Sequence, residues 1–136
     1  MMIKKYMRKL MAFFVALLGL TTACGQKNFE NNDVKGFAAL AKDSNVVVLD
    51  VRSAEEYAEG HIQGAVLIDQ GKDDFMETVQ ATLTKDKTIA VYCRSGRRSA
   101  NAAGRLAGVG YKCVNLIGGI IAWKAAEMPV IKENNK

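Results

Sequence analysis

The chain has 136 residues, of which 49% are hydrophobic and 24% are charged. This length and composition suit one globular domain and exclude a disordered, collagen-like or repeat protein. The formal net charge is +5, but four of the 19 basic residues and none of the 14 acidic residues lie in the first 23 positions, which leaves a net charge of +1 on the rest. The sequence therefore does not predict a nucleic-acid-binding surface.

The first 23 residues have the three-part order of a signal peptide. Lys4, Lys5, Arg8 and Lys9 form a basic segment, and an apolar run of 11 residues follows from Leu10 to Leu20. A membrane-spanning helix needs about 20 apolar residues, so this run is too short to remain as an anchor. A buried N-terminal helix is the alternative, but the run has no amphipathic face.

Cys24 follows three small residues, and the segment 20–25 resembles the lipobox of bacterial lipoproteins, in which the cysteine is acylated and becomes the new N-terminus. Leu20 lies four residues before Cys24 rather than three, and Thr21, Thr22 and Ala23 would also suit ordinary secretory cleavage. We expect a lipoprotein of the bacterial cell envelope, anchored through Cys24 and facing the periplasm. The next residue is glycine rather than the acidic residue that some bacteria read as an inner-membrane signal, which slightly favours the outer membrane.

After the signal peptide, hydrophobic patterning alternates between strand and helix periods. Residues 24–32 are predicted to be a polar tether, 33–131 one domain and 132–136 a polar tail. Helices are predicted at 33–42, 53–60, 74–83, 99–109 and 120–127; strands are predicted at 46–49, 65–68, 88–92 and 113–117, with Phe29 in a further edge strand. Short connections between alternating strands and helices imply parallel pairing through right-handed crossovers, and hence a three-layer α/β domain.

Three local features complete this pattern. Ser53 and Glu56 have the spacing of a capping box. Trp123 is expected in the core rather than against a ligand. His61 is the only histidine, which disfavours a metal cluster, and we expect it to make a local hydrogen bond.

Cys93 lies where the strand 88–92 ends and a helix is about to begin, in the segment Cys93-Arg94-Ser95-Gly96-Arg97-Arg98-Ser99. Ligands of open α/β sheets bind at the carboxyl ends of the strands. Nearby positive charge and helix N-terminal amides favour a thiolate, so Cys93 is the predicted nucleophile. Cys113 is predicted to be a buried hydrophobic residue; the alternative, a disulfide with Cys93, lacks a supporting framework of cysteines.

Several motifs together resemble the rhodanese-like, single-domain sulfurtransferases. The motifs are Asp50-Val51-Arg52, Glu55-Glu56-Tyr57, Gly60-His61-Ile62, Gly64-Ala65, Val91-Tyr92 with the cysteine segment 93–99, and Gly118-Gly119-Ile120-Ile121-Ala122-Trp123. The resemblance covers roughly residues 33–130. It implies a five-stranded parallel sheet flanked by helices and no metal or organic cofactor.

The resemblance also implies a reaction. Cys93 would take sulfane sulfur from a small anionic donor, thiosulfate or a polysulfide, and pass it as a persulfide to a thiol or cyanide. The predicted substrate-binding residues are Arg94, Ser95, Gly96, Arg97, Arg98 and Ser99. Their backbone amides would hold the terminal sulfur; Arg94 and Arg98 would attract the donor, with Arg97 as the alternative to either. Asp50 and Arg52 are expected to brace the structure rather than contact substrate.

Two other functions use the same features. A cysteine phosphatase or arsenate reductase has five residues between its cysteine and its arginine, but here Ser99 takes that arginine position and Arg98 comes one residue too early. The loop is therefore short for a phosphate, and Tyr92 replaces the usual histidine. A persulfide carrier or binding module that serves a membrane partner without turnover is the other alternative, because Cys93 alone does not separate a relay from an enzyme.

Overall fold

The computed structural model of the protein describes residues 28–133. The predicted signal peptide, Cys24 and most of the tether lie outside the described residues. Within residues 28–133, no helix is both long enough and apolar enough to span a membrane.

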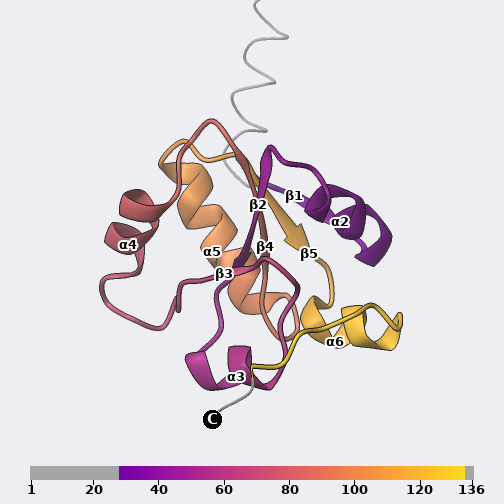
Figure 1. Ribbon diagram of the computed structural model, residues 1–136. Helices are drawn as coiled ribbons and strands as arrows, with labels where there is room; N and C mark the ends of the chain where they lie inside the picture. The colour runs from indigo at the N-terminus through magenta and orange to yellow at the C-terminus, as the bar shows by residue number, and fades with distance from the viewer. Residues whose placement is uncertain (1–27, 134–136) are drawn as a thin grey trace, which may run out of the picture.

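A five-stranded parallel sheet forms the centre of the domain, which confirms the predicted fold class (Figure 1). Its strands are β1 (Glu30–Asn32), β2 (Val46–Asp50), β3 (Val66–Leu67), β4 (Thr88–Tyr92) and β5 (Cys113–Leu116), in the spatial order β1-β5-β4-β2-β3. All four pairings are parallel. Their carboxyl ends therefore share one edge, and β4 lies in the middle of it.

Helices cover both faces of this sheet. They are α2 (Val34–Ala41), α3 (Ala54–Glu59), α4 (Phe75–Thr82), α5 (Arg97–Gly108) and α6 (Gly119–Ala125). Helices α4 and α5 pack on one face and α2 and α6 on the other, while α3 lies beyond the carboxyl edge (Figure 1). Alternate residues of β4 divide between the two cores because successive strand side chains point to opposite faces: Ile89 and Val91 face α5, and Ala90 and Tyr92 face α2.

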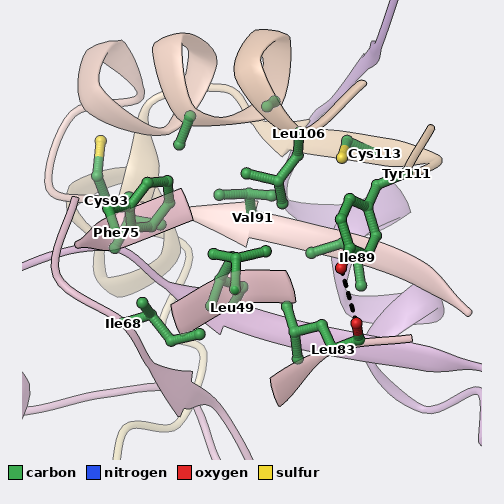
Figure 2. Packing of buried hydrophobic residues seen from close by; sticks show 14 residues of the cluster. Leu49, Ile68, Phe75, Leu83, Ile89, Val91, Cys93, Leu106, Tyr111 and Cys113 are labelled. Atoms are coloured by element: carbon green, nitrogen blue, oxygen red, sulfur yellow. Dashed lines mark hydrogen bonds between the residues drawn. The ribbon is translucent and has the colours of Figure 1, made fainter. Parts of the chain in front are cut away.

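The core under α4 and α5 extends along the strands from their amino ends to the carboxyl edge of the sheet (Figure 2). Cys93 lies at one end of this cluster and Cys113 at the other, and both thiols are free. Trp123 lies in the other core, where it is 4% exposed and its indole N–H donates to Pro129 O at 2.9 Å. Its predicted core position is confirmed.

The structure corrects two predicted boundaries. The tether of residues 24–32 was extended too far, because Glu30–Asn32 pairs with Val114–Leu116 as β1. Its Glu-Asn-Asn sequence has low strand propensity, and it is held as an edge strand by pairing with β5 alone. Helix α5 begins at Arg97 rather than Ser99, because Gly96 in a left-handed conformation forms the N-cap.

Candidate active site

Cys93 is the first residue after β4, at the carboxyl edge of the sheet, and it is fully buried. Two groups of the following segment donate hydrogen bonds to its sulfur: the Gly96 amide at 3.1 Å and the Ser99 hydroxyl at 3.3 Å. Ser99 is itself fully buried in the first turn of α5. The short loop from Arg94 to Gly96 therefore curls around the sulfur and brings the helix start onto it.

This arrangement reverses the usual effect of burial on a thiol. Burial raises the pKa of Cys93, but the Ser99 hydroxyl and the amides of Ser99, Gly96 and Ser95 outweigh it and lower the pKa below the ordinary value of 9.0. For Cys113 burial acts alone and raises the pKa to about 12. Residues 28–133 thus hold one thiol built to ionise, Cys93, and one that stays neutral, Cys113.

The start of α6 supports the cysteine loop from behind. The amide of Ile120 donates to Cys93 O at 2.9 Å, and the amide of Ile121 donates to Arg94 O at 3.2 Å. Because these carbonyls point toward α6, the loop amides are free to point at the sulfur. The approach is so close that a β-carbon on Gly119 would lie 2.6 Å from Cys93 O, and Gly119 also has a φ of +59°. Only glycine fits there.

Asn115 of β5 supports the loop from the neighbouring strand. This side chain is 4% exposed, and its amide donates to Asn31 Oδ1 at 3.0 Å and to Gly96 O at 3.4 Å. It therefore links the sheet to the glycine whose amide contacts the sulfur. Asn115 was not among the predicted site residues, although its place near the carboxyl end of a predicted strand was the signal that could have found it.

The three arginines of the loop have different surroundings. Arg94 and Arg97 are exposed and form no ion pair within residues 28–133. The guanidinium of Arg98 instead forms two parallel hydrogen bonds with the Glu56 carboxylate of α3, at 2.9 and 2.8 Å. The contact of Arg94 with an anionic donor stays a prediction, whereas Arg98 is engaged by the carboxylate of Glu56, which was predicted only as part of a capping box.

The Glu56 capping box is present as predicted. The Ser53 hydroxyl accepts from the Glu56 amide at 3.2 Å, and the Glu56 carboxylate accepts from the Ser53 amide at 3.3 Å. The hydrogen bond with Arg98 is the largest influence on the carboxyl group and lowers the pKa of Glu56 to about 2. Glu56 therefore links the start of α3 to the start of α5 as a permanent anion.

Asp50 and Arg52 form a buried ion pair next to this site. Arg52 donates to both Asp50 oxygens, with 2.6 Å between Nη2 and Oδ2, and Nη2 also donates to Gly60 O at 2.8 Å. The two side chains are 0% and 4% exposed. The pair fastens the end of β2 to the end of α3, a geometry that supports the predicted bracing role.

His61 also serves this region locally. Its ring stacks on Tyr57 with 3.7 Å between ring centroids, and its Nδ1 lies 3.0 Å from Tyr57 O. Its backbone pairs with Ile131 in an isolated antiparallel bridge. These contacts agree with the expected local hydrogen bond and fasten the C-terminal segment to α3.

Comparison with known proteins shows which family this chain resembles. Residues 33–126 match the rhodanese-like domain family. The protein YtwF of Bacillus subtilis is 44% identical over 90 residues, which are 66% of this chain and 84% of that protein. The thiosulfate sulfurtransferase GlpE of Coxiella burnetii is 36% identical over 87 residues, which are 63% of this chain and 78% of that protein.

A solved structure agrees with these matches. The rhodanese-related protein of Thermoplasma volcanium superimposes with a TM-score of 0.70 at 30% identity, covering 77% of this chain and all of that one. The family match includes both the sheet and the loop around Cys93. This chain therefore belongs to the rhodanese-like domain family.

Proposed function

We propose that this protein is a sulfurtransferase that carries sulfane sulfur as a persulfide on Cys93. The observation that carries the proposal is the Cys93 sulfur, which accepts hydrogen bonds from the Gly96 amide and the Ser99 hydroxyl at the carboxyl edge of the sheet. A thiolate is the reactive form of cysteine, and these donors favour it. The sulfurtransferase name of a relative that is 36% identical supports the same chemistry.

The reaction has two balanced steps. The Cys93 thiolate attacks the outer sulfur of a donor, thiosulfate or a polysulfide; the donor S–S bond breaks, and its electron pair leaves with sulfite or with a shortened polysulfide. The enzyme then holds an S–S bond whose outer sulfur is anionic. A thiolate or cyanide attacks that outer sulfur, and the Cys93 thiolate is regenerated. The steps balance without a metal or organic cofactor, and the two half-reactions predict ping-pong kinetics.

The loop amides suit the persulfide as well as the thiolate. In the persulfide the negative charge moves outward by one S–S bond, and the amides of Ser95, Gly96 and Ser99 lie around the position from which it extends. Fixed amide dipoles stabilise such an anion without reorganising. Cys93 is fully buried, so its sulfur presents almost no surface to a donor in this conformation. Arg94 and Arg97 are exposed cations of the same segment, which supports a role for them in attracting the anion.

A thiocyanate assay with thiosulfate and cyanide tests the proposal. Turnover that is lost in Cys93→Ser and kept in Cys113→Ser is expected, because only the first thiol lies in the loop. Parallel double-reciprocal lines at varied acceptor are also expected, and intersecting lines would contradict the two-step scheme. One sulfur added to Cys93 without turnover would instead favour the persulfide carrier. No added sulfur with any sulfane donor would refute both.

We also propose that the protein acts at the cell envelope, attached through a lipid on Cys24. The support is the sequence pattern of residues 1–25 alone. Globomycin, which blocks lipoprotein signal peptidase, should prevent maturation in expressing cells, and the mature protein should carry a diacyl or triacyl mass on Cys24. Normal processing in the presence of globomycin would refute lipidation. Fractionation of the two membranes would then test the proposed outer-membrane location.

A further inference from the structure

The ion pair between Arg98 and Glu56 changes the charge that a donor meets beside Cys93. Arg98 directly precedes Ser99, whose hydroxyl donates to the Cys93 sulfur at 3.3 Å, whereas Arg94 and Arg97 are solvent-exposed. Arg98 points both of its terminal nitrogens at one carboxylate, at 2.9 and 2.8 Å. Its positive charge is therefore largely neutralised before any donor arrives.

The surroundings of Arg98 reinforce this pairing. The hydrogen bond with Glu56 is the largest influence on the Arg98 guanidinium and raises its pKa, and the charges of Cys93 and of Asp69, which follows β3, act in the same direction. The side chains of Arg98 and Glu56 are 38% and 29% exposed, so solvent screens the pair only in part.

A donor with two negative charges is the one most disfavoured by this arrangement. Thiosulfate is a dianion, whereas persulfides and thiosulfonates carry one negative charge at most. We propose that Glu56 is a specificity-determining residue, which neutralises Arg98 and so favours singly charged sulfane donors over thiosulfate at Cys93. This inference rests on the proposed sulfurtransferase function and names the class of donor for the same site.

The chain offers a clean test of this role. Glutamine at position 56 keeps the capping box, because either Glu or Gln serves at that position of the motif. Glu55→Gln is the matched control, since Glu55 is an exposed neighbour in the same helical turn. The two donors are thiosulfate and benzenethiosulfonate, which react through the same outer sulfur and release sulfite or benzenesulfinate. They differ by one negative charge.

The measurement is the second-order rate constant for loading one sulfur onto Cys93, followed by mass spectrometry. Glu56→Gln should raise the ratio of the thiosulfate constant to the benzenethiosulfonate constant about fivefold, as expected for removing one partly screened charge. The ratio cancels any change in the ionisation of Cys93, which affects both donors equally. Glu55→Gln should change the ratio less than twofold.

A double variant separates neutralisation from direct binding. Glu56→Gln with Arg98→Gln removes one charge of each sign, so it should restore the wild-type ratio within about twofold. A several-fold fall in that ratio would mean that Arg98 contacts the donor directly and would overturn the inference, as would an unchanged ratio in Glu56→Gln. If wild-type Cys93 loads with neither donor, the inference fails, and if it also fails to load with a polysulfide, the proposed function fails with it.

Discussion

Replacing Ser99 with alanine tests whether the loop, rather than the arginines, makes Cys93 reactive. The Ser99 hydroxyl donates to the Cys93 sulfur at 3.3 Å, and both residues are fully buried. Alanine removes that donor and leaves the Ser99 amide, the Gly96 amide and the fold of the helix in place. We expect the pKa of Cys93 to rise.

The size of the rise follows from the kind of bond that is lost. A hydrogen bond to a charged group contributes about 1.5–3 kcal/mol, and 1.36 kcal/mol corresponds to about one pKa unit. The variant should therefore raise the pKa of Cys93 by removing that stabilisation of its thiolate. At a pH below the pKa of both proteins, alkylation should slow by about 10- to 100-fold at most, because the thiolate fraction falls while the more basic thiolate becomes a better nucleophile.

The assay is the pH dependence of Cys93 alkylation, with Cys113→Ser as the common background. Ser95→Ala is the matched control, because Ser95 acts on the sulfur through its backbone amide, which alanine keeps. The control should retain the wild-type profile. An equal shift in both variants, or no shift in Ser99→Ala, would refute the view that the buried hydroxyl stabilises the thiolate.

The same pKa shift has a consequence for stability. Because the pKa of Cys93 is lower in the folded protein than its ordinary value of 9.0, its contribution to the free energy of unfolding is complete above pH 9 and is lost as the pH falls through the folded pKa. Urea unfolding should therefore show wild type gaining stability over Ser99→Ala as the pH rises toward 9. A constant difference across that range would contradict the assigned cause.

Three further predictions concern the supports of the site. Asp50→Asn leaves Arg52 buried beside a neutral group and should lower the free energy of unfolding, measured with urea, by about 3–5 kcal/mol. A decrease below about 1 kcal/mol would contradict the bracing role of the ion pair. Gly119→Ala should abolish sulfur loading, because its β-carbon would lie 2.6 Å from a loop carbonyl, whereas Gly108→Ala, with nothing within 4 Å, should load normally. The pKa of Glu56 is lowered to about 2 from 4.5. The free energy of unfolding of wild type should therefore exceed that of Glu56→Gln by about 1 kcal/mol above pH 4.5, and this difference should disappear toward pH 2. An equal loss of stability with acid in both proteins would contradict the ion pair.

The sequence predicted the features that depend on neighbouring residues. The capping box at Ser53 needs only a serine and a glutamate three residues apart, and the structure contains both of its hydrogen bonds. The parallel sheet follows from alternating apolar strands and helices with short connections, and it is present. Cys93 was placed at a strand end by the apolar run before it, and it lies there.

Features that depend on polar pairing across the fold were missed or placed only approximately, since the edge strand expected around Phe29 lies at Glu30–Asn32. Strand β1 has three polar residues and exists because β5 offers a free edge beside it. Asn115 looks like an ordinary strand residue until its amide is seen between Asn31 and Gly96. In both cases the partner is distant in the chain. Neither the period of the hydrophobic pattern nor the strand propensity of the residues therefore indicates the pairing.

The pairing of Arg98 with Glu56 shows why a site's electrostatics need the fold. Counting charges along the segment 94–98 gives three cations around one cysteine and predicts an anion trap. The fold brings a carboxylate from 42 residues away onto Arg98. This pairing leaves the two exposed arginines to attract a donor, while the surroundings of Arg98 stay close to neutral. The stabilisation of the thiolate then falls to the amides and to Ser99, which are neutral dipoles. Such dipoles hold a thiolate or persulfide without binding a donor's second charge, so the same loop can ionise its cysteine strongly and still discriminate against a dianion.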